Sequence, residues 1–296
     1  MWNYTVNTVA YMRSTFDEVL DSVSKAGFKR VEIGEAHINV FKLSRSAVKD
    51  IREKFGSNGL EISSVMAEYG FDPTAPEGKN KFSFGHSSPI EREREVAVEQ
   101  EKKAVETAVE LGCSHMLTEF TGDIDRPAES RASFEKSIEE LIPVLEANDV
   151  TLCIEPHPGD FVEDAYPAID ILRSFHCRRI KYNYCVPHTF VLGHSPSEII
   201  EHSKGIIGHS HVADSIDPIR IFFCPTYTPK IKPHLHLIPG LGDVDFDGYL
   251  ASMQKSGYSG FLSLDVFSHM DRPTEAMVET RRKVERMTKR PRKTGP

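Results

Sequence analysis

The sequence lacks several features that would place it in a specialised class of protein. No apolar run approaches the roughly 18 residues that a membrane-spanning helix needs, which excludes an integral membrane protein. The segment Met1 to Val6 has no basic start followed by an apolar stretch. We therefore expect no secretory signal and a cytoplasmic location.

Cysteine is scarce, and the spacing of the cysteines matches no metal-binding or redox motif. The chain has five cysteines, none of them in a CxxC pair: Cys113, Cys153, Cys177, Cys185 and Cys224. Because their number is odd and their spacing wide, they do not match a zinc-ribbon or thioredoxin-like pattern, and we expect no disulfides.

Positive charge is in deficit. The 296 residues include 36 Lys and Arg against 44 Asp and Glu, for a formal net charge of −8. Neutralising phosphates requires clustered Lys and Arg, so this balance argues against a nucleic-acid-binding protein. The one basic stretch runs from Arg281 to Lys293, and we expect residues 281–296 to form a solvated tail.

Short apolar runs rich in β-formers alternate with segments of helical periodicity along the whole chain. This alternation is typical of an α/β protein. We expect strands at eight positions: Tyr4 to Ala10, Arg30 to Ile33, Ile62 to Met66, His115 to Glu119, Thr151 to Glu155, Ile180 to Tyr184, Ile206 to His211 and Gly260 to Val266.

Residue spacing predicts three of the intervening helices. The first has Ser14 as a candidate N-cap, Gly27 as its stop and an apolar stripe made of Phe16, Val19, Leu20 and Val23. The segment Glu91 to Leu111 is highly charged but has one apolar face: Val98, Val105, Ala108 and Val109. A later helix begins after Asp245 and ends at Gly257, with one face formed by Phe246, Tyr249, Leu250 and Met253.

Eight strand-helix units are the number that closes a (β/α)₈ TIM barrel, for which about 250 residues are typical. We therefore expect a single domain over residues 1–296. Two connections, Tyr69 to Ile90 and Ser215 to Ile238, are too long for simple turns and follow the third and seventh strands. The second is rich in proline and aromatic residues, and we expect it to form an ordered lid or a subunit contact.

Chemically capable side chains lie at the ends of four consecutive predicted strands. Glu155 ends the fifth, Cys185 and His188 follow the sixth, His211 ends the seventh, and Asp265 lies at the end of the eighth. In a closed barrel these ends surround one mouth, and such mixed donors suit Mn, Co, Zn or Mg. Each residue alone is also explained as a buried thiol, a core histidine or a helix cap, so the metal-site hypothesis depends on their convergence.

Six motifs occur in a fixed order along nearly the whole chain: residues 27–33 (GFKRVEI), 154–156 (IEP), 185–188 (CVPH), 209–214 (HSHVAD), 239–246 (PGLGDVDF) and 257–265 (GYSGFLSLD). With these motifs the sequence resembles the xylose isomerase-like TIM-barrel superfamily. That superfamily contains sugar isomerases and epimerases, including tagatose 3-epimerase-like and inosose-processing enzymes. The motifs are specific for the superfamily and not for a substrate.

The resemblance implies one divalent metal ion, held by Glu, Asp, His and Glu from strands five to eight. Glu155 and His211 match this set, whereas Cys185 stands in place of the Asp and Asp265 in place of the last Glu. We expect Mn first, with Co, Zn, Mg or Fe as alternatives. The softer thiolate favours Zn or Fe over Mg. His234 and His236 are spare donors from the long seventh loop.

The resemblance also implies an isomerase or epimerase that moves a proton beside the carbonyl of a sugar or keto-sugar, through a metal-stabilised enediolate. Glu155 and Asp265 would then be the two acid/base groups. We expect five further side chains to contact the sugar: His188, His157, Arg220, Glu119 and His236.

Three alternatives stay open. The first is a metal-dependent lyase or dehydratase acting on a keto-sugar, an inosose or a 3-keto-glycoside. The second is a phosphodiester-cleaving relative, against which the net charge of −8 argues. The third is a catalytically silent barrel that serves as a binding subunit, suggested by Cys185 and Asp265. At the family level, a homodimer or homotetramer is expected.

Overall fold

The chain folds into a closed barrel of eight parallel strands. The computed structural model describes residues 2–67, 84–218 and 234–289. Neighbouring strands follow the order of the chain, and β1 closes the barrel against β8. The strands are β1 (Asn3–Asn7), β2 (Arg30–Ile33), β3 (Glu61–Met66), β4 (His115–Glu119), β5 (Thr151–Glu155), β6 (Ile180–Cys185), β7 (Ile207–Val212) and β8 (Phe261–Leu264).

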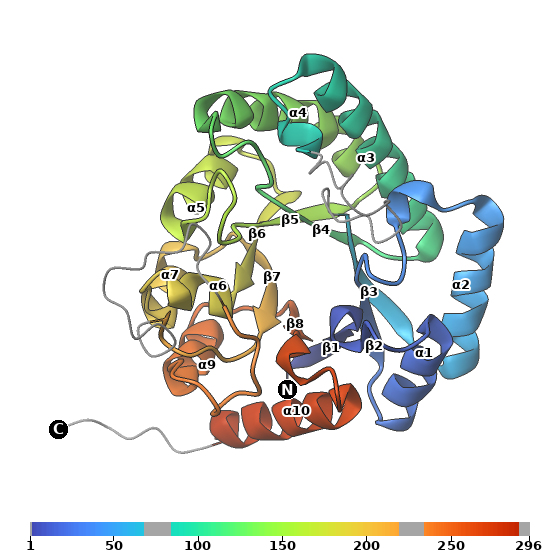
Figure 1. The fold of residues 1–296 in the computed structure, drawn as a ribbon, viewed down its shortest axis with the longest axis vertical. Helices are drawn as coiled ribbons and strands as arrows, with labels where there is room; N and C mark the ends of the chain where they lie inside the picture. The colour runs from blue at the N-terminus through green and yellow to red at the C-terminus, as the bar shows by residue number, and fades with distance from the viewer. Residues whose placement is uncertain (1, 68–83, 219–233, 290–296) are drawn as a thin grey trace.

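Helices surround the barrel on its outside (Figure 1). They are α1 (Phe16–Lys25), α2 (Arg45–Asn58), α3 (Glu91–Leu111), α4 (Pro127–Ala147), α5 (Ala165–Ser174), α6 (Val186–Val191), α7 (Pro196–His202), α9 (Phe246–Lys255) and α10 (Pro273–Lys289). Among the described residues no helix is long and apolar enough to cross a membrane. The predicted (β/α)₈ TIM barrel is confirmed.

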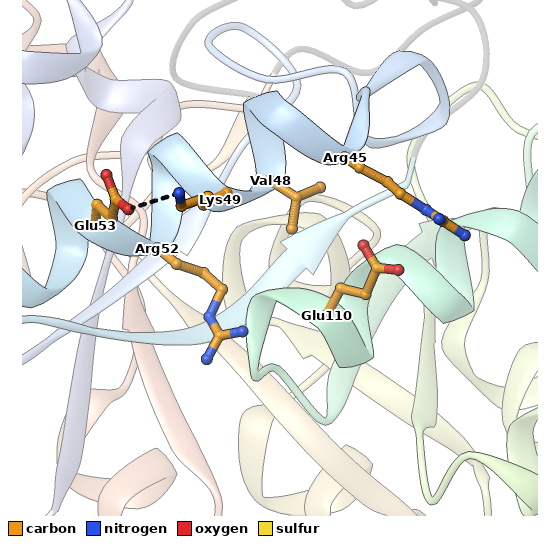
Figure 2. Close-up of a pocket in the computed structure, with 6 residues that line it drawn as sticks. All are labelled: Arg45, Val48, Lys49, Arg52, Glu53 and Glu110. Atoms are coloured by element: carbon orange, nitrogen blue, oxygen red, sulfur yellow. Dashed lines mark ion pairs between the residues drawn. The ribbon is translucent and has the colours of Figure 1, made fainter.

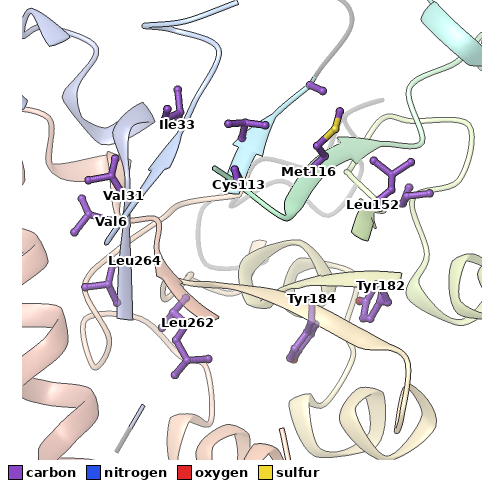
Figure 3. Close-up of a cluster of buried hydrophobic side chains, with 14 of the residues drawn as sticks. Val6, Val31, Ile33, Cys113, Met116, Leu152, Tyr182, Tyr184, Leu262 and Leu264 are labelled. Atoms are coloured by element: carbon purple, nitrogen blue, oxygen red, sulfur yellow. The ribbon is translucent and has the colours of Figure 1, made fainter. Parts of the chain in front are cut away.

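Alternate residues of each strand face two different environments. Val31 and Ile33 belong to the large apolar core, part of which is drawn in Figure 3, whereas Glu32 between them contacts histidines of β7. Met66, Leu117 and Cys153 form a second, small apolar cluster. The period of two along a strand therefore separates a packing face from a face that carries polar groups.

The predicted elements differ from the structure mainly at their ends. The first strand ends at Asn7 and not at Ala10, because the Asn7 side chain accepts a hydrogen bond from Val9 N (2.9 Å) and begins a 3₁₀ helix. The N-cap of α1 is Thr15 and not Ser14, since Thr15 forms a capping box with Glu18.

Two further expectations need correction. Val109 is 43% exposed, so it does not share the buried face of α3 with Val98, Val105 and Ala108. The first part of the expected solvated tail is helical, because α10 continues to Lys289. Arg281 donates to the carbonyl oxygens of Ala26 and Gly27, which anchors this helix to the end of α1.

The connection after β7 is fixed at both of its described ends. Asp214 and Leu237 exchange backbone hydrogen bonds of 2.7 and 2.8 Å. The buried Asp214 carboxylate accepts four backbone N–H groups at 2.7 to 3.1 Å, from Ser215, Gly240, Gly242 and Val244. Most of the two long connections lies outside the described residues, so the expected lid stays a prediction.

Replacing Asp214 by Ala should destabilise the protein, because four backbone N–H groups lose their buried charged acceptor. We expect a loss of about 3 kcal/mol, or a fall in Tm of roughly 5 °C or more. Thermal unfolding of Asp214→Ala beside Asp247→Ala, which changes an exposed residue of α9, measures this. Equal Tm values for the two variants would contradict it.

Candidate functional site

The expected metal ligands converge at the carboxyl ends of the last four strands. Glu155 ends β5, Cys185 ends β6 and pairs in register with His211 of β7, and Asp265 directly follows β8. Each is at most 4% exposed. The donor atoms of Glu155, Cys185 and His211 lie within 4.8 Å of one another.

His211 lies between carboxylates on both sides of its ring. Its Nδ1 is 2.9 Å from Glu155 Oε2 and 3.9 Å from Asp265 Oδ2, and its Nε2 is 2.9 Å from Glu32 Oε1. Burial alone would lower the pKa of His211, but Glu155 and Glu32 hold it well above its ordinary value. The positive form of the ring is therefore favoured by the carboxylates on both of its sides.

Glu32 of β2 is a central residue that the sequence analysis quoted only as part of a motif. It is fully buried, 2.6 Å from His209 Nε2, and it accepts hydrogen bonds from Ser64 and Ser263. Burial alone would raise the pKa of Glu32, but His209 and His211 lower it, so the group stays ionised. Glu32 contacts Nε2 of His211, so Nδ1 of the same ring faces Glu155. In metal sites, a carboxylate that does not touch the metal often orients a metal-binding histidine in this way.

Asn183 and His188 fix the orientation of the Glu155 carboxylate. The Asn183 amide donates to Oε2, and His188 Nδ1 lies 2.7 Å from Oε1. Burial and the neighbouring His157 lower the pKa of His188 to about 3, although Glu155 acts in the opposite direction. His188 is therefore neutral at physiological pH. Asn183 was not among the site residues predicted from the sequence.

His236 comes from the connection after β7 and lies against Asp265. Its Nδ1 is 2.8 Å from the Asp265 carbonyl oxygen and 2.9 Å from Oδ2, and its ring stacks on Phe267 at 4.0 Å. Within the described part of the chain, Asp265 Oδ1 and His236 Nε2 are buried without a hydrogen-bond partner. Two buried polar atoms without partners indicate that the site is built for something to bind there.

A second polar group lies at the ends of β4 and β5. The donor atoms of Glu119, His157 and Asp160 lie within 4.8 Å of one another. Burial, followed by nearby carboxylates, raises the pKa of Asp160 well above its ordinary value, and burial also raises that of Glu119. Protonated carboxyl groups can donate hydrogen bonds to sugar oxygens.

The structure thus brings eight of the expected residues to one end of the barrel. They are Glu119, Glu155, His157, Cys185, His188, His211, His236 and Asp265, each of which belongs to or contacts one of the groups above. Arg220 lies outside the described residues. Glu32, His209 and Asn183 join the site from within strands β2, β7 and β6, and they were not predicted as site residues because they do not end an apolar run.

The donor set fits a divalent ion. The donor atoms of Glu155, Cys185 and His211 lie within 4.8 Å of one another, and Asp265 Oδ2 lies 3.9 Å from His211 Nδ1. Asp265 Oδ1 is buried with no hydrogen-bond partner among the described residues. Such mixed oxygen, nitrogen and sulfur ligands suit zinc-like ions better than magnesium.

A surface pocket between α2 and α3 contains none of these residues (Figure 2). It is lined by exposed side chains around Val48, and the ion pair between Lys49 and Glu53 crosses its edge at 3.7 Å. Because it lies on the outer helices, it is separate from the polar end of the barrel.

Glu35 provides a test of the electrostatics at the barrel mouth. Burial raises its pKa to about 7, and Glu119, Asp265 and Glu32 add to the effect. Its folded-state pKa therefore exceeds the unfolded value of 4.5, so its stabilising contribution is full below pH 4.5 and is lost as the pH rises through 7. The free energy of unfolding of Glu35→Gln, relative to that of the native protein, should therefore increase as the pH rises from 5 to 8. The increase should be at most about 3 kcal/mol.

Thermal unfolding across that pH range measures the difference. Glu106→Gln, on the exposed face of α3, is the matched control and should follow the native protein. A difference between Glu35→Gln and the native protein that is independent of pH would refute the raised pKa.

Comparison with known proteins gives a family and a fold. The model of the xylose isomerase-like TIM barrel family matches residues 20–287. No functionally curated protein sequence matches the chain.

Solved structures of the same fold cover nearly the whole chain at low sequence identity. D-psicose 3-epimerase from Clostridium cellulolyticum H10, solved with D-tagatose, has a TM-score of 0.74 at 14% identity over 97% of this chain and 99% of that one. The IOLI protein with a bound zinc atom has a TM-score of 0.73 at 18% identity over 97% and 98%. A probable 3-DHS dehydratase from Bacillus anthracis has a TM-score of 0.66 at 15% identity over 98% and 100%. Since the family model spans most of its length, the chain belongs to the xylose isomerase-like TIM-barrel family.

Proposed function

We propose that the chain is a divalent-metal-dependent isomerase or epimerase of a sugar or keto-sugar. One observation carries the proposal: two buried carboxylates, Glu155 and Asp265, face the same nitrogen of His211 from different strands at 2.9 and 3.9 Å. The fold is shared with a D-psicose 3-epimerase, which supports this class of reaction.

Glu155, Cys185, His211 and Asp265 are the residues that would hold the ion. When bound there, a divalent ion supplies Lewis-acid stabilisation of the negative charge that develops on a substrate carbonyl. The sequence alone put manganese first. Because the Cys185 sulfur lies within 4.8 Å of the donor atoms of Glu155 and His211, we now place a zinc-like ion ahead of manganese. The IOLI protein, which shares the fold, was solved with a zinc atom.

The two carboxylates perform the proton transfer in this proposal. Glu155 removes the proton from the carbon beside the carbonyl and keeps it, and Asp265 in its protonated form delivers its own proton to the other face or to the neighbouring carbon. Exchange with solvent then restores ionised Glu155 and protonated Asp265. Burial alone would raise the pKa of Glu155, but His211 and His188 hold it well below its ordinary value, so it is ionised as a base must be.

The remaining polar groups would bind the sugar. We assign His188, His157, His236 and Glu119 to hydrogen bonds with hydroxyl or carbonyl oxygens, since all four lie beside the two carboxylates. Arg220 keeps the same proposed role from the segment that the structure does not describe. Holding the sugar in one orientation is what makes a single proton accessible to Glu155.

A metal-dependent lyase or dehydratase is the second candidate, and Asp160 is the observation that favours it. A carboxyl group whose pKa is raised well above its ordinary value by burial can protonate a departing hydroxyl. The fold shared with a probable dehydratase is in keeping with that chemistry.

Glu155→Gln should abolish proton transfer while the fold is retained, because an amide cannot accept the proton. Ketoses such as D-psicose and D-tagatose, incubated with the metal-loaded protein in D₂O, report the step as deuterium exchange by NMR. We expect the variant to lose about 10²- to 10⁴-fold in rate.

Glu110→Gln, an exposed change on α3, should exchange at the native rate. New unsaturated products in the same spectra would indicate the lyase. Undiminished exchange by Glu155→Gln would overturn the assignment of the base, and a native protein that binds no divalent ion would favour the silent barrel.

A further inference from the structure

The first layer of side chains inside the barrel, at the amino ends of the strands, is unusually polar. Successive residues of a strand alternate between the inside and the outside of the barrel, so counting back by twos from the inward-facing site residues gives this layer. It consists of Arg30, His115, Lys181 and Phe261, from β2, β4, β6 and β8. Branched apolar side chains usually fill such layers, whereas two of these four are cationic.

Ring contacts agree with this placement. The Phe261 ring lies 5.5 Å from the His115 ring, and Arg30 Cζ lies 5.8 Å from the centre of Phe261. Because β4 and β8 are on opposite sides of the barrel, the contact between His115 and Phe261 crosses its interior. Burial, His209 and Arg179 lower the pKa of His115 to about 4, so the positive charge of this end comes from lysine and arginine.

Lys181 and Arg179 reach this end from neighbouring positions of the chain. Lys181 Nζ donates to the carbonyl oxygen of Gly205 at 3.0 Å. Its stem passes Gly208, where an added Cβ would lie 2.6 Å from the Cβ of Lys181, so a larger residue would displace the lysine. Arg179 pairs with Asp149, and its buried Nε has no hydrogen-bond partner among the described residues. The protein thus leaves cationic donors available at this end.

Positive charge is concentrated in the connections that lead into the amino ends of the strands. From the end of the helix before each of β2 to β8 through the second residue of the strand, these connections contain six Lys or Arg and two acidic residues. They cover residues 26–31, 59–62, 112–116, 148–152, 175–181, 203–208 and 256–262. Since the whole chain has a net charge of −8, this end is a basic region of an acidic protein. Such a region concentrates anions.

A pocket of about 290 Å³ lies beside these cations. Small residues at the amino ends of β7 and β8 line most of it: Gly205, Ile207, Gly208 and residues 256–260. The ammonium group of Lys181 lies next to this pocket, because its hydrogen-bond acceptor is Gly205. Small side chains leave backbone N–H groups accessible to an anion.

We propose that this basal site, made of Arg30, Arg179, Lys181 and the adjoining pocket, binds a phosphate group, either as free phosphate or on a small monoester. Guanidinium groups bind phosphate oxygens in pairs, and an ammonium group adds a point charge. The occupant is distinct from the sugar of the proposed function. His115 and Glu119 are the first and last residues of β4, which separates the two sites by roughly 13 Å.

Isothermal titration calorimetry of the full chain at physiological ionic strength tests the site, with inorganic phosphate and glucose 6-phosphate as ligands and glucose as the uncharged control. We expect one phosphate group bound per chain. Lys181→Met and Arg30→Met should each weaken binding about tenfold or more, because each removes a charged hydrogen-bond donor. Lys29→Met removes an exposed charge from the same end and should bind as the native protein does.

The comparison of ligands identifies the source of the phosphate. Binding of glucose 6-phosphate at least tenfold tighter than that of inorganic phosphate indicates a monoester, and equal or weaker binding indicates free phosphate; both support the site. Circular dichroism checks that each variant is folded, and Arg179→Gln replaces any variant that is not.

Two results would overturn the proposal. The first is a folded native chain that binds neither phosphate ligand. The second is binding that Lys181→Met and Arg30→Met leave unchanged, or that Lys29→Met weakens equally, because the phosphate would then lie elsewhere or respond only to net charge.

Discussion

The burial of Glu32 is the constraint on which the arrangement of the site depends. A carboxylate that is removed from water must be compensated, and here His209, His211, Ser64 and Ser263 do so. Because His211 also contacts Glu155, one imidazole ring joins a group in the interior of the barrel to a group at its mouth. The orientation of His211 is therefore fixed by the fold before any ligand is present.

The long connection after β7 is tied to the same site by backbone groups. Asp214 gathers four N–H groups, and the pairing of Asp214 with Leu237 holds the neighbouring His236 beside Asp265. His236, although it belongs to a loop, is therefore held in position by backbone hydrogen bonds on its neighbour, as a strand residue is. This matters for a group such as His236, whose proposed role depends on the direction of a single lone pair.

The barrel and much of the site could be predicted from the sequence because both depend on local patterns. Apolar runs predicted the strands, and Glu155 and Asp265 were found because a polar residue that ends an apolar run stands out. Glu32, His209 and Asn183 were missed because they lie within strands, and their partners come from strands distant in the sequence. Ser14 and Thr15 are both good N-caps, and only the reciprocal hydrogen bond of Glu18 distinguishes them.

A line of hydroxyl groups continues from Glu32 away from the histidines. Ser64 donates to Glu32 at 2.6 Å, Ser63 lies 3.3 Å from Ser64, and Thr5 lies 2.6 Å from Ser63. These three hydroxyl groups thus extend the polar contacts of Glu32 beyond its histidine partners. An apolar replacement at Ser64 would pack well and yet remove a donor from a buried charge. A replacement at Ser64 must therefore preserve a hydrogen bond as well as a shape, whereas a replacement in the apolar core has to preserve shape alone.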